Sequence, residues 1–155
     1  MAMMTARMIE VCIFTIRNNE QPMYLLLRRS DKERIYPGIW QFVTGSIEKG
    51  EKASNAALRE LAEETGMKPK AFWVVPYINS FYDPGWDSVN LMPVFAAEVE
   101  PDKNPVLSAE HEEFEWLPLE KALERLVWPG QKEGMKIVHE YIVKGKQAAA
   151  LRRLI

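Results

Sequence analysis

Three glutamates crowd into the short segment RELAEETG, at positions Glu60, Glu63 and Glu64. Residues 51–65 have the composition of a helix, and Gly66 is suited to end it in the left-handed region. With about 100° between successive residues, the three glutamates fall on one face of that helix. The other side carries a stripe formed by Leu58, Leu61, Ala62 and Thr65. We therefore expect the helix to dock on a sheet through Leu58, Leu61 and Ala62 and to turn its acids away.

The acidic face has two interpretations. Like charges three and four residues apart each destabilise a helix by roughly 0.2–0.5 kcal/mol, and acids near its C-terminal end oppose the helix dipole. The face is either a solvated surface on which Arg59 pairs with Glu63, or a site for hard divalent cations. In the second case the helical spacing holds the carboxylates together and the metal cancels their repulsion.

The remaining chain alternates between extended and helical segments. Strands are predicted at residues 8–16, 24–27, 39–44, 72–77 and 89–99, with a short extended segment at 114–117. Residues 119–126 and 131–144 are predicted helical, and the tail QAAALRRLI either extends the last helix or frays. The turn-rich stretch FYDPGWDS separates two of the strands. This mixture favours an α/β sandwich in a single domain spanning residues 1–155.

Composition excludes several classes of protein. The chain has 155 residues, of which 47% are hydrophobic and 27% charged, and its formal charge is −2. This net charge does not favour binding to nucleic acid or to an anionic membrane. Its single cysteine, Cys12, lies in an apolar run and cannot form an intramolecular disulfide. No segment reaches the roughly 18 apolar residues of a membrane span, and the N-terminus is a poor signal peptide. We expect a soluble, cytoplasmic protein.

A longer pattern surrounds the glutamates. Residues 45–67 read GSIEKGEKASNAALRELAEETGM. This stretch resembles the Nudix box, G-x5-E-x7-R-E-U-x-E-E-x-G-U with U an aliphatic residue, and matches it at every specified position when Met67 is the final U. The chain is therefore identified as a member of the Nudix hydrolase family.

The resemblance implies a fold, a chemistry and a set of residues. The fold is an α/β/α sandwich with a mixed sheet, and the reaction is the cleavage of a nucleoside diphosphate linked to another group by water, assisted by Mg²⁺ or Mn²⁺. The implied metal ligands are Glu60, Glu63, Glu64 and a backbone carbonyl of Gly45 or Thr44. Arg59 would orient a carboxylate, and Glu51 would hold the loop that precedes the helix.

Members of the family often add an acid from a later loop. The candidates here are Glu110, Glu112 and Glu113 in SAEHEEFEW, and we favour Glu110 as auxiliary metal ligand or base. The alternative is a solvated acidic loop. His111 beside it is interpreted as a surface or hydrogen-bonded histidine rather than a ligand.

Cationic and aromatic residues outside the box are candidates for substrate binding. Arg28 and Arg29 end the second predicted strand, where one of them could clamp a phosphate while its neighbour points to the other face. Tyr82 and Trp86 lie in the turn-rich stretch and could stack on a base. Trp40 is expected in the core.

The sequence favours one class of substrate and leaves two alternative functions open. WQFVTGSIEKGE resembles bacterial dihydroneopterin triphosphate and dATP pyrophosphohydrolases, which favours release of pyrophosphate from a nucleoside or pterin triphosphate. Two alternatives stay open: a Nudix hydrolase of dinucleoside polyphosphates or nucleotide sugars, and a module that binds nucleotide or RNA without cleaving it. The expected partner is a small nucleotide-like molecule, with no membrane and no nucleic acid, and a homodimer is left open.

Overall fold

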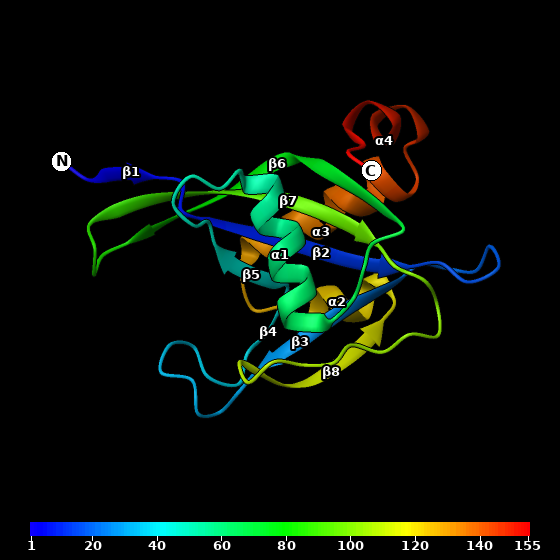
Figure 1. Ribbon diagram of the computed structural model, residues 1–155, viewed down its shortest axis with the longest axis horizontal. Coiled ribbons are helices and arrows are strands. Elements are labelled where there is room, and N and C mark those ends of the chain that lie inside the picture. The colour runs from blue at the N-terminus through cyan, green and yellow to red at the C-terminus, as the bar shows by residue number, and fades with distance from the viewer.

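Strand β2, Met8–Thr15, runs through the middle of the computed structural model, which describes residues 1–155 (Figure 1). Successive side chains of a strand point to opposite faces, and both faces of β2 are apolar. Ile9, Val11 and Ile13 belong to one buried cluster, and Cys12 and Phe14 to another. The strand therefore lies between two hydrophobic cores, which explains its nearly continuous apolar sequence.

The strands form one eight-stranded sheet. Their bounds are Met3–Thr5 (β1), Met8–Thr15 (β2), Met23–Arg29 (β3), Trp40–Gln41 (β4), Val43–Ser46 (β5), Ala71–Asp83 (β6), Ser88–Glu98 (β7) and His111–Leu117 (β8). β7 pairs in parallel with β1 and β2, while the other pairs are antiparallel. The sheet is therefore mixed.

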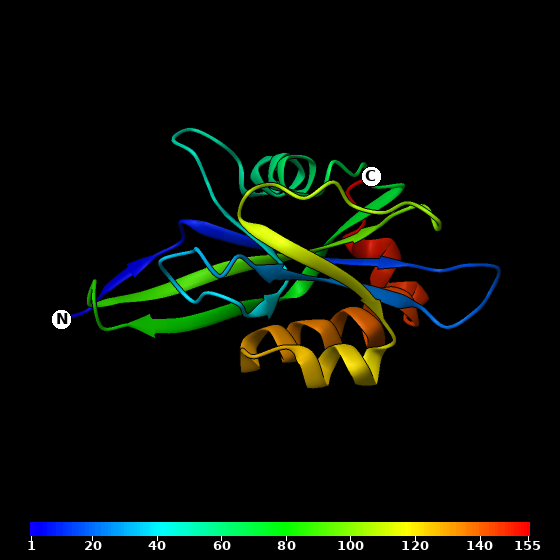
Figure 2. The same cartoon turned by 90° about the horizontal axis from the view of Figure 1, so that it is seen from below.

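Helices cover both faces of this sheet. Figure 2 shows α1, Ala53–Thr65, on one side, and α2, Leu119–Arg125, with α3, Pro129–Ile137, on the other. Each side encloses one of the two buried clusters, with Leu61 on the α1 side and Phe42 and Met135 on the other. The expected α/β/α sandwich with a mixed sheet is confirmed. None of the helices combines the length and the hydrophobicity that a transmembrane span requires.

Several segments differ from the expected bounds. The single strand predicted at residues 39–44 is two strands, because β4 pairs with β3 and β5 pairs with β2. β6 continues through part of the turn-rich stretch to Asp83, since it pairs with β7 as far as Asp83 opposite Ser88. β8 begins at His111, where it pairs with Arg29. In each case pairing with a neighbouring strand outweighs local composition.

The C-terminal helical region is less regular than predicted. After α3 the chain forms a π-helical segment, Val138–Val143, and then a separate short helix α4, Lys146–Arg152. The last residues return to the sheet, where the amides of Leu154 and Ile155 both donate to the Phe72 carbonyl. The tail neither extends the last helix nor frays, because these bonds hold it against β6.

α1 also packs on the sheet differently from the expected stripe. Its buried residues are Ala56, Ala57, Leu61, Glu64 and Thr65, while Ala62 is exposed and Leu58 is only partly buried. On a helical wheel the buried stripe is turned toward the acidic face by about one residue step, roughly 100°. The expectation that Ala62 faces the sheet and that the acids all face away was therefore wrong. The small side chains of Ala56 and Ala57 let this side of the helix approach the sheet.

Candidate active site

Glu64 is a buried carboxylate at the end of α1. Gly66 ends the helix in the left-handed region, with φ of 67°, and its amide donates to the Ala62 carbonyl. Glu64 lies in the last turn and is 3% exposed, and neither of its carboxylate oxygens has a hydrogen-bond partner. A buried polar group is normally paired, so these two oxygens call for a ligand or a proton.

Glu60 lies against strand β5 at Gly45. A Cβ built on Gly45 would come within 2.2 Å of the Glu60 carboxyl carbon, so any side chain at position 45 would displace the Glu60 carboxylate. Gly45 therefore lets the helix bring Glu60 onto the backbone of β5. Glu63, by contrast, has a side chain that is 58% exposed.

Arg59 ties the acids of the helix together. Its Nη1 donates to Glu60 Oε1 at 2.9 Å and to Glu63 Oε2 at 3.3 Å. These charge-assisted hydrogen bonds fix the orientation of the Glu60 carboxylate. The predicted orienting role of Arg59 thus has a geometric basis.

Arg59 also holds the loop before the helix. Its guanidinium donates to both carboxylate oxygens of Glu51, at 2.8 and 2.9 Å, and to the Ser46 carbonyl at 2.8 Å. Glu51 in turn accepts from the Glu48 amide at 3.0 Å. The Arg59 hydrogen bonds lower the pKa of Glu51 to about 2. Glu51 contacts loop and helix, as expected of a residue that holds the loop.

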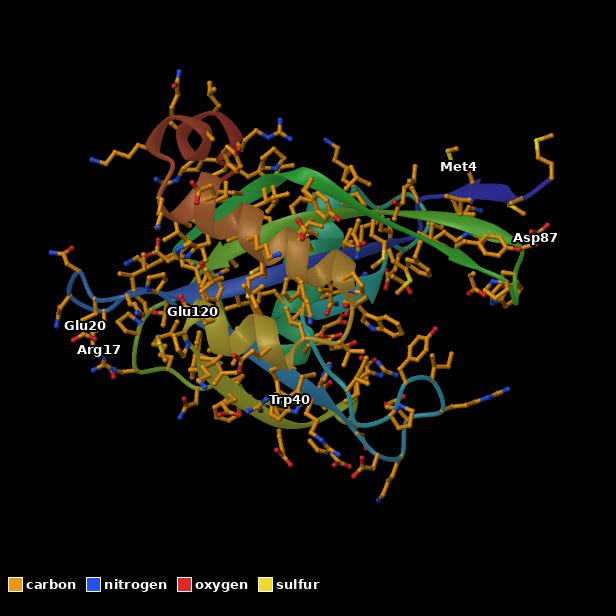
Figure 3. All side chains as sticks on the ribbon, turned by 180° about the vertical axis from the view of Figure 1, so that it is seen from behind. Met4, Arg17, Glu20, Trp40, Asp87 and Glu120 are labelled. Carbon is orange, nitrogen blue, oxygen red and sulfur yellow. The ribbon has the colours of Figure 1, made fainter.

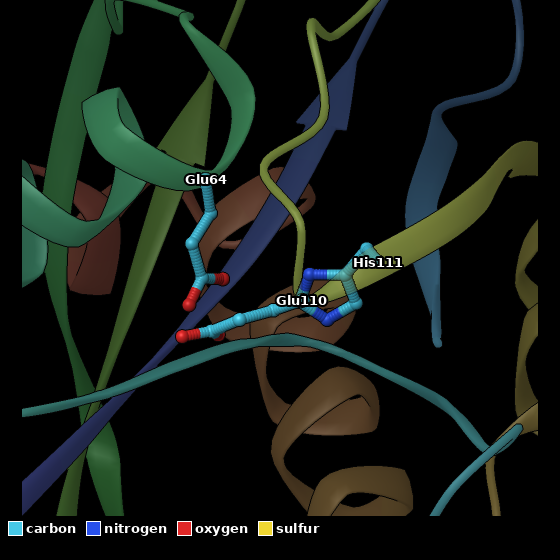
Figure 4. A group of neighbouring side chains, drawn as sticks. All are labelled: Glu64, Glu110 and His111. Carbon is cyan, nitrogen blue, oxygen red and sulfur yellow. The ribbon is translucent and has the colours of Figure 1, made fainter. Parts of the chain in front are cut away.

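The loop before β8 brings two further side chains to Glu64. Ligand-capable atoms of Glu64, Glu110 and His111 all lie within 4.8 Å of one another, and Figure 4 shows the carboxylates of Glu64 and Glu110 directed toward each other. Burial raises the pKa of Glu64 to about 10, and the negative charges of Glu110 and Glu60 contribute to that rise. The carboxylates of Glu64 and Glu110 thus lie together, and Glu60 of α1 is near enough to raise the pKa of Glu64.

Comparison with known proteins assigns this arrangement to a family. The model of the NUDIX domain matches residues 6–138. The chain belongs to the Nudix family.

The chain is also similar to proteins of known name and to solved structures. The Nudix domain is 34% identical over 137 residues to an octanoyltransferase of Myxococcus xanthus, covering 84% of this chain but only 36% of that protein. It is 31% identical over 146 residues to the dihydroneopterin triphosphate diphosphatase of Haemophilus influenzae, covering 81% of this chain and 82% of that one. A Caenorhabditis elegans Ap4A hydrolase structure superposes with a TM-score of 0.76 at 18% identity, covering 90% of this chain and 99% of that one, which supports the fold.

The other two acids of the β8 region have different surroundings from Glu110. Glu112 accepts hydrogen bonds from Arg28, from the Ser30 hydroxyl and from the Asp31 amide, at 3.0, 2.9 and 3.1 Å. Glu113 lies opposite Arg28 in the β3–β8 ladder and is exposed. Of the three candidate acids, only Glu110 belongs to the group formed with Glu64 and His111.

His111 is more deeply placed in this Nudix domain than a surface histidine. It is 4% exposed, and its Nε2 lies 3.2 Å from Nε2 of Gln41 on β4. Burial, with a smaller effect from Arg29, lowers the pKa of His111 to about 4, so the ring is neutral at pH 7. Of the two interpretations from the sequence, the surface histidine was wrong, whereas the hydrogen-bonded histidine agrees with the Gln41 contact. Nothing local in SAEHEEFEW indicates the burial, because it depends on β4 and β8 pairing with opposite edges of β3.

Arg28 and Arg29 lie at the end of β3, near the start of β8. Arg28 donates to Asp31 at 2.7 Å and to Glu112 at 3.0 Å. Arg29 donates to the Ile35 carbonyl at 3.0 Å and to Glu33 at 3.3 Å. Both arginines organise the loop after β3, and Arg29 faces His111 across the ladder. Their predicted contact with a phosphate stays a prediction.

The aromatic candidates lie elsewhere. Tyr82 and Trp86 are at the tip of the β6–β7 hairpin, which extends past α1 in Figures 1 and 2; Figure 3 labels Asp87 at this tip. Trp86 is 79% exposed, and the Tyr82 hydroxyl donates to Asp87 at 2.8 Å. The structure does not bring these two rings to the carboxylates, and stacking on a base stays a prediction. Trp40 packs against the core as expected, beneath the Arg125 guanidinium.

One buried polar group was missed by the sequence analysis. Glu10 of β2 is 2% exposed on the α3 side of the sheet, where Asn79 and Gln131 each donate to one of its oxygens at 2.6 Å. The signal was an acid inside the apolar run MIEVCIFTI, which is unusual for a buried strand. Its partners are 69 and 121 residues away, so no local pattern could identify them.

Proposed function

We propose that this Nudix domain is a divalent-metal-dependent pyrophosphohydrolase that cleaves a nucleoside or pterin triphosphate to the monophosphate and pyrophosphate. The observation that carries the proposal is the buried Glu64 carboxylate, whose oxygens have no hydrogen-bond partner and which lies beside Glu60 and Glu110. Burying an ionised carboxylate beside two others is costly unless a cation compensates. A divalent cation compensates all three together.

The residues present fit such an ion. Mg²⁺ prefers carboxylate and carbonyl oxygens and keeps several waters, and Mn²⁺ accepts the same donors. We assign the ligands to Glu60, Glu64, Glu110 and the Gly45 carbonyl, with the exposed Glu63 at the solvent side. When bound, the ion would neutralise charge on the polyphosphate and make water more acidic.

The side chains of the chain itself have three tasks. Arg59 holds the Glu60 carboxylate in place, and Glu51 anchors Arg59 to the preceding loop. Arg28 or Arg29 at the end of β3 would bind a phosphate after releasing one of the hydrogen-bond acceptors that it now contacts. Glu110, which is exposed, serves as auxiliary ligand or as the base. Water adds to a phosphorus atom, the bond to pyrophosphate breaks, and a carboxylate accepts the proton.

The substrate class rests on the relatives. The Haemophilus influenzae protein named dihydroneopterin triphosphate diphosphatase is similar over most of both chains. The Ap4A hydrolase is similar at only 18% identity, a likeness that concerns the fold. A triphosphate is therefore favoured over a dinucleoside polyphosphate or a nucleotide sugar. A module that only binds nucleotide is disfavoured because Glu51, Glu60, Glu63 and Glu64 are all present.

A panel of substrates tests the proposal. The 155-residue chain is incubated with Mg²⁺ and, separately, dATP, dihydroneopterin triphosphate, diadenosine tetraphosphate and ADP-ribose. Pyrophosphate and orthophosphate are measured separately. We expect pyrophosphate from a triphosphate as the fastest reaction. Preferred turnover of ADP-ribose or diadenosine tetraphosphate contradicts the substrate class, and binding without turnover of any compound contradicts the enzymatic function.

A further inference from the structure

His111 reaches the carboxylate cluster with one ring nitrogen that has no partner. Its Nε2 contacts Gln41, whereas its Nδ1 is buried and makes no hydrogen bond. The same ring lies within 4.8 Å of ligand-capable oxygens of Glu64 and Glu110 (Figure 4). In Figure 4 the ring nitrogen next to Cγ, which is Nδ1, lies on the side of Glu64, so the unpartnered nitrogen is directed toward the unpartnered oxygens of Glu64.

A proton cannot satisfy these atoms together. Glu64 contributes two buried oxygens and His111 one buried nitrogen, and all three lack partners. One proton can join only one pair of them, which leaves another lone pair buried and unpaired. A cation that accepts lone pairs from carboxylate and imidazole satisfies them at once.

We propose that Nδ1 of His111 is a direct ligand of the divalent cation held by Glu64 and Glu110, and that this mixed nitrogen and oxygen set favours a first-row transition-metal ion over Mg²⁺. This inference rests on the proposed metal-dependent function. Imidazole suits ions of the later first row, whereas Mg²⁺ is bound by oxygen. Affinity for such a site rises from Mn²⁺ to Co²⁺ along the row, so we expect Co²⁺ to bind more tightly than Mn²⁺, and both more tightly than Mg²⁺.

Gln41 is the residue that positions the imidazole. A free lone pair on Nδ1 requires the ring proton on Nε2, which then donates to an acceptor. Rotating the Gln41 side-chain amide by 180° exchanges its nitrogen for its oxygen. The oxygen then lies where it can accept the Nε2 proton of His111. Gln41 is 6% exposed on β4, so its amide stays beside the ring. Outer partners of this kind commonly orient the histidines that bind metals.

Spectroscopy of the bound ion tests the ligand directly. The chain contains only two histidines, His111 and His139, so protein labelled with ¹⁵N-histidine reports on few positions. Pulsed electron paramagnetic resonance of the Mn²⁺-loaded protein should show nitrogen coupling that changes from the ¹⁴N to the ¹⁵N pattern on labelling. Mn²⁺ that is bound without any histidine coupling overturns the inference while leaving the proposed function intact. If no Mn²⁺ binds at all, both fail.

Two matched variants complete the test. His111→Gln should abolish the nitrogen coupling and weaken Co²⁺ binding by about tenfold or more, while Mg²⁺ binding changes much less. His139→Gln is the control, because His139 contacts the Tyr24 hydroxyl at 2.8 Å on the α3 side of the sheet. It should retain both the coupling and the Co²⁺ affinity. Coupling that persists in His111→Gln, or that disappears in His139→Gln, overturns the assignment, and the labelled wild-type spectrum decides should either variant fail to fold.

Discussion

Gly45 and Glu60 are in such close contact that a Cβ at position 45 would lie 2.2 Å from the Glu60 carboxyl carbon. This contact joins the last residues of β5 to the acidic face of α1. It explains in steric terms why glycine stands at the first position of the box.

Gly45→Ala should therefore displace Glu60 and reduce kcat/KM for the preferred substrate. A misplacement of about 1 Å in a catalytic group can cost on the order of 100-fold. The matched control is Gly134→Ala in α3, where an added Cβ meets Phe42 and Tyr77 at ordinary contact distances of 3.7 Å. The control should keep full activity. Equal activity of both variants would show that the position of Glu60 has no bearing on the reaction.

Glu64→Gln should remove activity without unfolding the protein. The amide has nearly the same shape but no charge, so it cannot hold a cation as the carboxylate does. Loss of a preorganised charged group at a phosphate site typically costs on the order of 10²–10³-fold in kcat. Turnover and circular dichroism measure the two effects. Glu124→Gln, on the surface of α2, is the control and should leave both unchanged. Unfolding of Glu64→Gln would instead assign Glu64 a structural role.

Leu61→Ala should lower stability rather than alter the chemistry directly. Leu61 is fully buried between α1 and the sheet, and truncating such a leucine costs about 2–5 kcal/mol in the free energy of unfolding. Leu58 is only partly buried, so Leu58→Ala should cost less. Urea denaturation at one temperature compares the two. Similar losses would mean that the helix packs as the simple wheel predicts, with Leu58 and Leu61 equally buried.

Glu10 should make stability depend on pH. Burial raises the pKa of Glu10 above its ordinary value of 4.5, and the hydrogen bonds from Asn79 and Gln131 offset this only in part. As pH rises past 4.5, the unfolded chain loses this proton before the folded protein does, so the folded state loses stability as pH rises through the folded pKa.

Glu10→Gln removes that titration. If the Gln131 amide rotates, the introduced amide can donate to Oε1 of Gln131, and this bond replaces the one that Gln131 donates to Glu10 in the wild type. The free energy of unfolding of Glu10→Gln, relative to wild type, should increase as pH rises above 4.5, as urea denaturation would measure. The corresponding difference in unfolding free energy for Glu124→Gln should not change with pH. A falling difference for Glu10→Gln would mean that the folded protein stabilises the ionised form.

The part of the site that lies on α1 could be predicted from the sequence, because helical spacing alone holds Glu60, Glu63 and Glu64 on one face. The burial of Glu64 could not, since it depends on the small residues Ala56 and Ala57 and on the loop that carries Glu110. A helical wheel shows which residues share a face, but it contains no information about the elements that pack against the helix. The motif requires a glycine at position 45 without giving a reason, and the close contact with Glu60 supplies a steric one.

The part of the site that comes from the sheet required the structure. Gln41 and His111 meet because β4 and β8 both pair with β3. No spacing rule relates the two positions. The long β6–β7 hairpin likewise extends through residues whose composition favours a turn, and it carries Tyr82 and Trp86 away from the acids. Pairing between strands determined both outcomes.

Anomalous diffraction from a crystal grown with Mn²⁺ would locate the metal ion directly. We expect a peak bounded by the carboxylates of Glu60, Glu64 and Glu110, present in the wild type and absent in Glu64→Gln. A wild-type crystal with no peak among these carboxylates, or with its manganese bound elsewhere on the molecule, would contradict this expectation.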